Sequence, residues 1–180
     1  MLLDCERSVL IVIDVQERLA PAMHDLPRFL RNTEILMRAA ARLQVPMIVT
    51  EQYPKALGQT IEAIAALAPA DGVVEKISFS AAGSDGFDRR FAELGRDEPV
   101  ICGIEAHVCV LQTALRLRER GLKSWMVRDA TTSRQPDSAS AAYERSAGAG
   151  VGLVTTEMVV FEWLRQAGTQ QFREISALIK

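Results

Sequence analysis

Residues 8–13 read SVLIVI, and Asp14 follows them directly. An unbroken apolar run of this length predicts a β-strand that is buried on both faces, because a strand with one face in water alternates polar and apolar residues. Strands of this kind are typical of parallel sheets that helices cover on both sides. The run therefore indicates an α/β fold, and the acidic residue at its end is the first candidate for chemistry.

The rest of the chain repeats this pattern of short apolar runs separated by helical periodicity. Further strands are expected at residues 47–50, 72–76, 99–103, 123–127 and 151–155. Helices are expected at residues 27–43, 60–67, 86–94, 108–120, 136–147, 157–166 and near 170–179. Six strands that alternate with helices predict parallel βαβ units. We therefore expect a three-layer α/β/α fold with a six-stranded parallel sheet, in a single domain over residues 1–180.

Length and composition are those of one ordinary soluble domain. The chain has 180 residues, of which 48% are hydrophobic and 24% are charged, and its net charge is −2. These values exclude a disordered chain, and no apolar run approaches the roughly 20 residues that a membrane span needs. The N-terminus lacks a basic region and a small-residue cleavage site, so no secretory signal is expected. The near-neutral charge, without a long Lys/Arg run, argues against nucleic acid as a partner.

The cysteine and histidine counts limit the chemistry that is available. The three cysteines, Cys5, Cys102 and Cys109, form an odd set, so we expect reduced thiols in the cytoplasm rather than a disulfide framework. The only histidines are His24 and His107, which excludes a histidine-rich metal site. We expect no metal ion and no other cofactor.

Ligands of an open parallel sheet bind at the carboxyl ends of the strands. In this sequence those ends are residues 14–16, 50–53, 76–80 and 104–109. Three of these four segments contain a side chain that can transfer a proton or act as a nucleophile, namely Asp14, Lys76 and Cys109.

Each of these three residues also has an ordinary structural interpretation. Asp14 is either a general base or a carboxylate that caps backbone N–H groups, because an acid at the end of a buried strand is costly unless it is paired. Lys76 either faces solvent or pairs with Asp14 and raises the local positive potential. Cys109 is either an inert buried thiol or a thiol at a helix start, where the dipole stabilises the thiolate. Cys5 and Cys102 are expected to be structural.

Together, these residues and their surroundings resemble the isochorismatase-like superfamily of cysteine hydrolases. The resemblance covers nearly the whole chain. It rests on the segments LIVIDVQERL (10–19), PMIVTEQYPKALG (46–58), EKISFSA (75–81), GIEAHVCVLQTA (103–114), DATTSR (129–134) and VTTEMVVFEWL (154–164). It implies a Rossmann-like α/β/α fold and a Cys-Asp-Lys triad. In this sequence the triad is Cys109 as nucleophile, Asp14 as base, and Lys76.

The resemblance also implies a mechanism. Asp14 takes the thiol proton, Cys109 attacks a carbonyl carbon, and water hydrolyses the resulting adduct. In the superfamily the oxyanion is stabilised by the nucleophile's own N–H and by the N–H of the residue four positions before it, here Cys109 and Glu105. A non-proline cis peptide precedes that second residue, which corresponds to the Ile104–Glu105 bond.

Five residues near the strand ends are candidates for binding the substrate, namely Gln16, Gln52, Tyr53, Phe79 and His107. Tyr53 and Phe79 would form an aromatic wall suited to a small flat substrate. The alternatives are core packing for Phe79, loop solvation for Gln52 and Tyr53, and a solvent-facing cap for His107.

One departure from the superfamily concerns the cofactor. Metal-dependent nicotinamidases carry a cluster of Asp and His after the second strand, whereas residues 50–58 read TEQYPKALG and contain no histidine. The sequence therefore resembles the metal-free branch of small hydrolases with unassigned substrate. A metal-assisted amidase that uses Asp14 and Glu51 is a minor alternative, because two carboxylates without histidine are poor zinc ligands.

The sequence supports two functions of different classes. The first is a hydrolase that acts on the amide or a related C–N bond of a small molecule. The second is a catalytically silent scaffold or partner-binding protein with the same fold, and the complete set of Asp14, Lys76 and Cys109 favours the enzyme. The superfamily forms dimers through octamers, so we expect a homo-oligomer. Four apolar residues belong either to the core or to an interface, namely Val159, Val160, Phe161 and Trp163.

Overall fold

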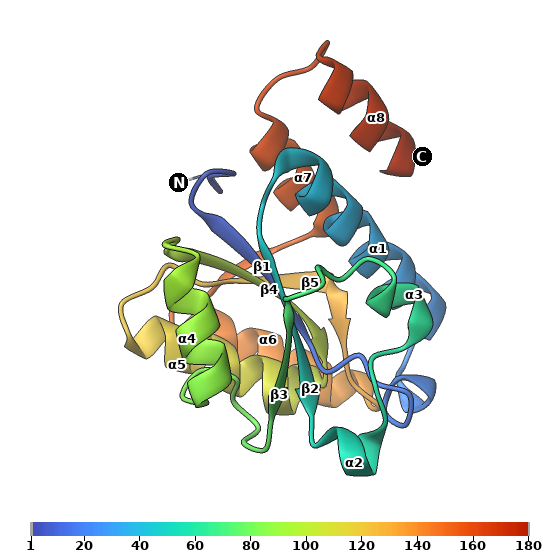
Figure 1. The fold of residues 1–180 in the computed structure, drawn as a ribbon, viewed down its shortest axis with the longest axis vertical. Helices are drawn as coiled ribbons and strands as arrows, with labels where there is room; N and C mark the ends of the chain where they lie inside the picture. Colours follow the sequence, from blue (N-terminus) through green and yellow to red (C-terminus); the bar gives the residue numbers. More distant parts are fainter. Residues whose placement is uncertain (1, 180) are drawn as a thin grey trace.

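The computed structural model describes residues 2–179 and contains a six-stranded sheet (Figure 1). The strands are β1 (Ser8–Ile13), β2 (Met47–Gln52), β3 (Val73–Lys76), β4 (Glu98–Ile104), β5 (Trp125–Thr132) and β6 (Gly152–Val154). They lie in the order β3-β2-β1-β4-β5-β6, and all neighbouring pairs are parallel. The chain reverses its direction of winding between β1 and β4. Their carboxyl ends therefore form the switch point where open parallel sheets bind ligands.

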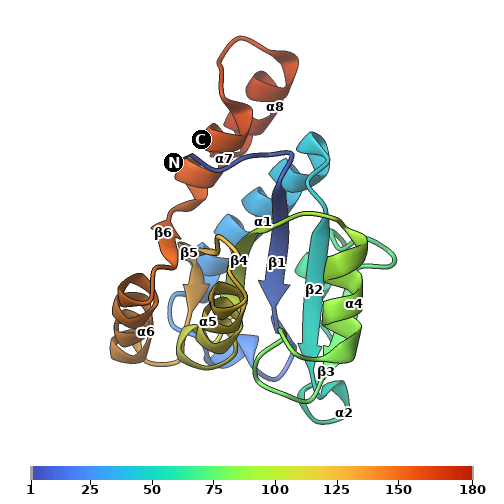
Figure 2. The ribbon, with the colours of Figure 1, turned by 90° about the vertical axis from the view of Figure 1, so that its left-hand side faces the viewer.

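Helices cover both faces of the sheet, which confirms the predicted three-layer architecture (Figures 1 and 2). The main helices are α1 (Leu26–Leu43), α3 (Glu62–Ala65), α4 (Asp85–Glu93), α5 (Leu111–Glu119), α6 (Pro136–Gly148), α7 (Thr156–Leu164) and α8 (Gln170–Ile179). α1, α3 and α7 pack on one face, and α4, α5 and α6 pack on the other. α8 packs on α1 and α7, outside these layers. Within residues 2–179, no helix is both long and apolar enough to cross a bilayer.

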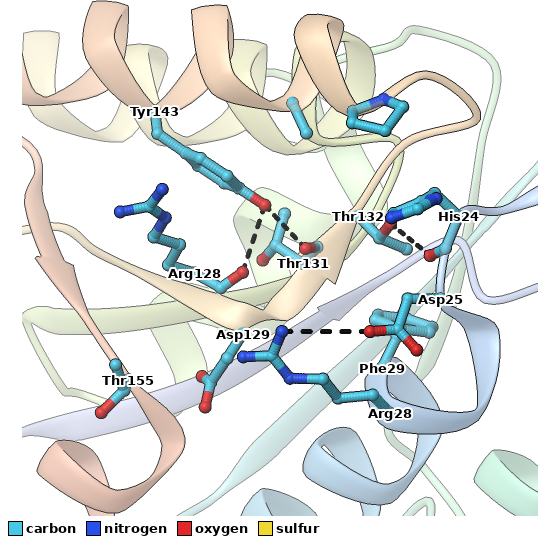
Figure 3. A pocket seen from close by; sticks show the side chains of 12 residues that line it. His24, Asp25, Arg28, Phe29, Arg128, Asp129, Thr131, Thr132, Tyr143 and Thr155 are labelled. Atoms are coloured by element: carbon cyan, nitrogen blue, oxygen red, sulfur yellow. Dashed lines mark hydrogen bonds and ion pairs between the residues drawn. The ribbon is translucent and has the colours of Figure 1, made fainter.

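β5 is longer than the sequence pattern predicts. The apolar run predicts a strand over 123–127, but β5 continues to Thr132, and β6 pairs only with residues 125–127. The pattern misses the second half because residues 128–132 read RDATT and are mostly polar. β6 therefore leaves one edge of β5 free beyond residue 127. The hydroxyl of Tyr143 donates hydrogen bonds to two carbonyl oxygens of this part of β5 (Figure 3).

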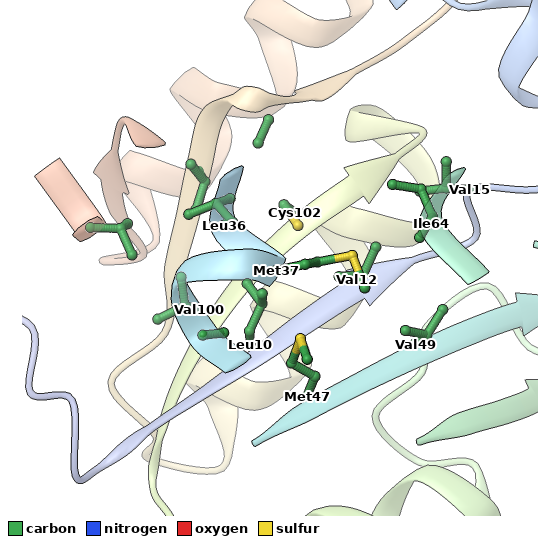
Figure 4. Close-up of a cluster of buried hydrophobic side chains, with 14 of the residues drawn as sticks. Leu10, Val12, Val15, Leu36, Met37, Met47, Val49, Ile64, Val100 and Cys102 are labelled. Carbon is green, nitrogen blue, oxygen red and sulfur yellow. The ribbon is translucent and has the colours of Figure 1, made fainter. Parts of the chain in front are cut away.

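β1 lies at the centre of the core, and its side chains point alternately to the two faces. Leu10 and Val12 belong to the cluster beneath α1 and α7, whereas Ile11 and Ile13 belong to the cluster beneath α5 and α6. All four are fully buried. Figure 4 shows Leu10 and Val12 beside Met37 of α1. Burial on both faces therefore explains the unbroken apolar run, as predicted.

The segment around Cys109 is not one regular helix. The pattern predicts a helix over 108–120, whereas the structure has a π-helical turn, η2 (Ala106–Val110), followed by α5. π-helical turns are frequent at functional sites. Two short helices, η1 (Ala20–Ala22) and α2 (Pro54–Leu57), follow β1 and β2. They are too short to produce a periodic sequence pattern.

Candidate active site

Asp14 and Lys76 form a buried ion pair at the carboxyl ends of β1 and β3. Lys76 Nζ lies 2.7 Å from Asp14 Oδ2, and both side chains are completely shielded from solvent. Lys76 is the last residue of β3 and Asp14 follows β1, with β2 between the two strands. The lysine side chain spans that strand, so of the two alternatives for Lys76 the structure has the pairing with Asp14.

Both partners make further hydrogen bonds, which is the condition under which charges are tolerated in a protein interior. Thr50 Oγ1 donates to Asp14 Oδ1 at 2.7 Å, so each carboxylate oxygen has a donor. Lys76 Nζ also donates to Gln52 Oε1 at 2.8 Å. The carbonyl oxygens of Ser78 and Phe79, in the loop after β3, accept from Nζ at 3.3 and 3.1 Å. The ammonium group is therefore fixed by four acceptors, and the carboxylate is oriented from two sides.

The backbone brings the end of β1 close to the end of β4. Asp14 has a φ of 52°, in the left-handed region that Asp adopts more readily than most residues. On β4, Gly103 pairs with Ile13 and has a φ of 121°. A Cβ atom at Gly103 would lie 2.2 Å from the carbonyl oxygen of Ile13. Only glycine permits this approach, and η2 begins just beyond it.

Cys109 lies in η2 and is 6% exposed. Thr113 connects its turn to the loop after β3, because Thr113 Oγ1 donates to the Cys109 carbonyl oxygen at 2.7 Å and accepts from Ala81 N–H at 2.9 Å. The same loop supplies the two carbonyl acceptors of Lys76. The candidate nucleophile and the lysine are therefore held in one hydrogen-bonded unit.

The charges of Asp14 and Lys76 act on the Cys109 thiol in opposite directions. Burial, and then the negative charge of Asp14, raise the pKa of Cys109 to about 12, whereas Lys76 lowers it. Burial also raises the pKa of Asp14 above its ordinary value, against the opposing effect of Lys76. A thiol with a pKa near 12 is protonated at neutral pH. Burial and Asp14 thus outweigh Lys76 at the resting thiol, and stabilisation of the thiolate by the start of the helix stays a prediction.

The side-chain amides of Gln16 and Gln52 bind the protein itself. Gln16 Nε2 donates to the carbonyl oxygens of Gln52 and Gly58 at 3.1 and 2.7 Å, and Gln16 Oε1 accepts from Gln52 N–H at 2.8 Å. Gln52 Nε2 donates to the Ile77 carbonyl oxygen at 2.5 Å while its Oε1 accepts from Lys76. Gln16 therefore fixes the loop after β2, and Gln52 positions Lys76. Contact of either amide with a substrate stays a prediction.

The other three predicted pocket residues differ in exposure. Tyr53 and Phe79 are 47% and 56% exposed, so Phe79 is not a core residue. Tyr53 N–H donates to the Lys76 carbonyl oxygen, which places this aromatic residue beside the carboxyl end of β3. His107 is half-buried, and its Nδ1 lies 3.0 Å from Ser133 Oγ. Tyr53 and Phe79 are thus available to contact a ligand, whereas one nitrogen of His107 is already paired.

The carboxylate of Glu105 is directed to Arg134. The backbone N–H and Nε of Arg134 both donate to Glu105 Oε2 at 3.1 Å. The Ile104–Glu105 peptide bond is cis, as the resemblance implies. The N–H groups of Val108 and Val110 donate to the carbonyl oxygen of Glu105. These bonds fold the backbone tightly at the start of the turn that carries the candidate nucleophile.

Thr50, Thr113 and Arg134 hold the site together, and the sequence reasoning did not single them out. Thr113 has a recognisable signal, since a threonine hydroxyl four residues after Cys109 can bond that residue's carbonyl group along a helix. Thr50 and Arg134 have no such local signal. Their partners lie 36 and 29 residues away along the chain.

Glu51 does not join Asp14. Side chains alternate along a strand, so Glu51 points to the face opposite to Thr50 and Gln52. Its Oε1 accepts from the N–H and Oγ1 of Thr60 at 2.6 and 2.7 Å, which fixes the loop before α3. In the described part of the chain, no three His, Cys, Asp or Glu side chains are grouped so that they could hold a metal ion. The geometry therefore gives no support to a carboxylate pair of Asp14 and Glu51.

Sequence comparison places this site within a known family. The profile described as "Isochorismatase domain" matches residues 8–158, which include Asp14, Lys76 and Cys109. The secreted isochorismatase effector Isc1 of Phytophthora sojae is 36% identical over 177 residues, covering 96% of this chain and 84% of the relative. Isochorismatase domain-containing protein 2 of Danio rerio is 36% identical over 180 residues, covering 98% of this chain and 89% of the relative.

Solved structures share the fold over nearly the whole chain. The MAR1 ribonuclease of Caenorhabditis elegans superposes with a TM-score of 0.92 at 33% identity, covering 99% of this chain and 92% of that chain. The ycaC gene product of Escherichia coli, described as an octameric hydrolase of unknown specificity, superposes with a TM-score of 0.89 at 23% identity. That match covers 99% of this chain and 87% of the other, and at this identity it concerns the fold alone.

Proposed function

The chain belongs to the isochorismatase family, and on this basis we propose that it is a cysteine hydrolase that cleaves the amide or a related C–N bond of a small molecule. The observation that carries the proposal is the buried pair of Asp14 and Lys76, whose charges act on the thiol of Cys109. A buried ion pair adds little to stability, because the cost of desolvation offsets its attraction. A pair of this kind beside a thiol, at the carboxyl edge of a parallel sheet, is instead typical of groups with pKa values tuned for chemistry.

In the proposed first step, Asp14 accepts the proton of the Cys109 thiol while Sγ attacks the carbonyl carbon of the substrate. The C–N bond then breaks, and the departing nitrogen takes the proton from Asp14. In the second step, Asp14 removes a proton from water as the water oxygen attacks the thioester. The acid product leaves, and the proton on Asp14 returns to the sulfur of Cys109. The raised pKa of Asp14 suits this exchange, because it brings the carboxyl group closer to the pH at which it works.

Lys76 orients Asp14 and balances the charge of the site. When the thiol proton moves to Asp14, the ammonium group of Lys76 remains to stabilise the negative charge that develops on sulfur. Its four acceptors keep Nζ in place during this transfer. Gln52 is therefore assigned a positioning role.

The N–H groups of Glu105 and Cys109 are proposed to stabilise the oxyanion. Backbone donors fixed before the reaction are the most effective oxyanion ligands. The ion pair of Glu105 with Arg134, at 3.1 Å, supports this assignment because it offsets a negative charge that would otherwise oppose the oxyanion.

A small substrate fits this site better than a polymer. Cys109 is only 6% exposed, so the reacting bond has to reach a recessed sulfur atom. Tyr53 and Phe79 are proposed to contact the substrate at the entrance of the site. Gln16, Gln52 and His107 are proposed to contact it deeper in the same site. The name of the C. elegans protein refers to ribonuclease activity, but RNA binding depends on an excess of Lys and Arg, and this chain has a net charge of −2. We therefore propose no activity on RNA.

Assembly and location are part of the proposal. We place the protein in the cytoplasm as a homo-oligomer, with one domain over residues 1–180. Support comes from the free thiols of Cys5, Cys102 and Cys109 and from the octamer described for the E. coli protein. The P. sojae relative is named as secreted, so location differs within the family.

The test is hydrolysis of a panel of small amides and carbamoyl compounds by the purified protein. Turnover by the wild type that disappears in Cys109→Ala supports the cysteine hydrolase. Turnover that Cys109→Ala retains overturns the assignment of the nucleophile. If the wild type hydrolyses no member of the panel, the silent scaffold with the same fold becomes the better description.

A further inference from the structure

A cavity lies apart from the catalytic cluster, along the part of β5 that β6 does not cover. β6 pairs with β5 only over residues 125–127, so the following five residues of β5 form a free edge in the described part of the chain. The cavity between this edge, α1 and α6 has a volume of about 450 Å³. Small-molecule sites in proteins have volumes in this range. None of Asp14, Lys76 and Cys109 lines it.

The free edge of β5 is closed to pairing with another strand. Tyr143 OH donates to the carbonyl oxygens of Arg128 and Thr131 at 3.1 and 2.7 Å (Figure 3). Asn32 Nδ2 donates to the carbonyl oxygen of Asp129 at 2.8 Å. An added strand would need these carbonyl groups as acceptors. The cavity is therefore suited to a small molecule rather than to an extended peptide.

Two guanidinium groups at the cavity have few partners within the described chain. Arg128 lies over the ring of Tyr143, 5.2 Å from its centroid, and has no carboxylate oxygen of residues 2–179 within 4.0 Å. Arg28 has a single ion pair, with Asp25 at the long distance of 3.9 Å. Both arginines line the cavity, and Figure 3 shows Arg28 of α1 turned toward Asp25 and Arg128 of β5 turned toward the ring of Tyr143. Most of their N–H donors are therefore free to bind an anion.

The two acidic residues of the cavity are associated with helix starts. Asp129 Oδ1 accepts from the N–H and Oγ1 of Thr156 at 2.7 and 3.0 Å, at the first residue of α7. Asp25 immediately precedes α1. The positive end of the α7 dipole stabilises Asp129, which therefore does not need an arginine as its partner. The side chain of Asp25 makes no hydrogen bond to the start of α1, and its partner is Arg28, at the long distance of 3.9 Å. In addition, Thr131 lines the cavity, is 4% exposed, and has a hydroxyl group without a hydrogen-bond partner in residues 2–179.

We propose that this cavity binds a small organic carboxylate. The guanidinium groups of Arg28 and Arg128 hold the carboxylate, since arginine matches its planar, two-oxygen geometry. The apolar body of the ligand lies against Phe29 and Ala139, two buried residues that line the cavity. Thr131 Oγ1 supplies a further polar contact. This site is independent of the proposed hydrolase site.

Benzoate and its neutral counterpart benzamide are the probes for this proposal. Both have the same ring, and only benzoate has the charge that the arginines recognise. Titration of the full chain carrying Cys109→Ala, followed by protein NMR, separates binding at this cavity from any chemistry at the thiol. We expect saturable binding of benzoate, with shifted signals at Thr131 and Tyr143, and at least tenfold weaker binding of benzamide.

Three variants locate the site. Arg28→Gln and Arg128→Gln should each weaken benzoate binding about tenfold, because each removes a charged donor. Arg145→Gln is the control, since this exposed arginine is on α6 but does not line the cavity. Equal binding of benzoate and benzamide, or benzoate binding that both arginine variants leave unchanged, overturns the proposal. The absence of saturable benzoate binding at millimolar concentration also overturns it, and none of these three results bears on the hydrolase proposal.

Discussion

Lys76 Nζ and Asp14 Oδ2 are 2.7 Å apart in a place where neither side chain is exposed to solvent. Each charge is tolerated there because the other is present. Lys76 therefore controls the ionisation of Asp14, and both charges control the Cys109 thiol. Removing either charge therefore shifts the pKa of Cys109, and removing Lys76 also shifts the pKa of Asp14. The directions of these shifts distinguish the roles of Asp14 and Lys76.

Lys76→Met removes the positive charge and keeps most of the length of the side chain. We expect the pKa of Asp14 to rise, because burial raises it and Lys76 opposes that effect. Hydrolysis at pH 7 should fall by about 100-fold or more, and the acid limb of the kcat/KM profile should move to higher pH. Lys55→Met is the matched control, since Lys55 is exposed on α2. An acid limb at the wild-type position would contradict the coupling of Lys76 to Asp14.

The same variant should change how stability depends on pH. Burial already raises the pKa of Asp14 in the folded wild type above its value in the unfolded chain, and the loss of Lys76 raises it further. The free energy of unfolding, relative to wild type, should then be highest below the ordinary pKa of Asp, at about pH 4, and decrease as the pH rises through the folded value. Urea denaturation of both proteins between pH 4 and pH 8 measures this difference. A difference that is constant with pH would show that Asp14 keeps its ionisation without the lysine.

Cys109→Ala and Cys109→Ser should abolish hydrolysis and leave the fold intact. Both substitutions remove the thiol nucleophile with little change in volume. Circular dichroism and the thermal midpoint report the fold, and turnover of the best substrate in the panel reports activity. Cys5→Ala is the control, because Cys5 lies at the opposite end of β1 and contacts the Leu43 carbonyl oxygen. Wild-type turnover by Cys109→Ala would contradict the triad.

Metal chelation should leave hydrolysis unchanged. The carboxylate oxygens of Asp14 are occupied by Thr50 and Lys76, and one oxygen of Glu51 is occupied by Thr60. The chain also has only two histidines. Activity of the purified protein before and after EDTA treatment, and after addition of Zn²⁺, tests this expectation. A loss of activity that zinc restores would contradict the metal-free mechanism.

The elements with a strong apolar pattern could be predicted from the sequence, and so could the residues at their ends. The run at 8–13 gave β1 because both faces of that strand are buried. Asp14 and Lys76 meet because the carboxyl ends of parallel strands lie at the same edge of the sheet. The first of these predictions needs only the local pattern of apolar residues. The second needs only the general topology of parallel sheets.

Other parts of the site depend on contacts between distant segments and leave no periodic trace. The polar second half of β5 is held by β4 and by Tyr143 rather than by apolar burial of its own side chains. The sequence predicts Gln16 and Gln52 as substrate ligands, which stays a prediction, but it gives no sign that their amides also bind main-chain groups and Lys76. The π-helical turn at Cys109 has the composition of an ordinary helix. Its departure from that geometry becomes visible only in three dimensions.

Asp14→Asn is expected to affect two reactions of Cys109 in opposite directions. Asparagine keeps the shape of the side chain but cannot accept the thiol proton, so kcat for hydrolysis should fall by roughly 10²–10⁴. The variant also removes the negative charge that raises the pKa of Cys109, while Lys76 remains in place. More thiolate is then present near neutral pH, and alkylation by iodoacetamide should become faster.

The rate of Cys109 alkylation as a function of pH, followed by mass spectrometry of its peptide, measures this opposition. Cys5 in the same sample is the internal standard, because its pKa is raised chiefly by burial and it lies at the other end of β1. The expected order of rates at pH 7 is Asp14→Asn, then wild type, then Lys76→Met. Asp14 raises the thiol pKa and Lys76 lowers it, so the two variants should lie on opposite sides of the wild type. If Asp14→Asn slows alkylation and hydrolysis together, the charge of Asp14 does not oppose thiolate formation, and the electrostatic account of Cys109 is wrong.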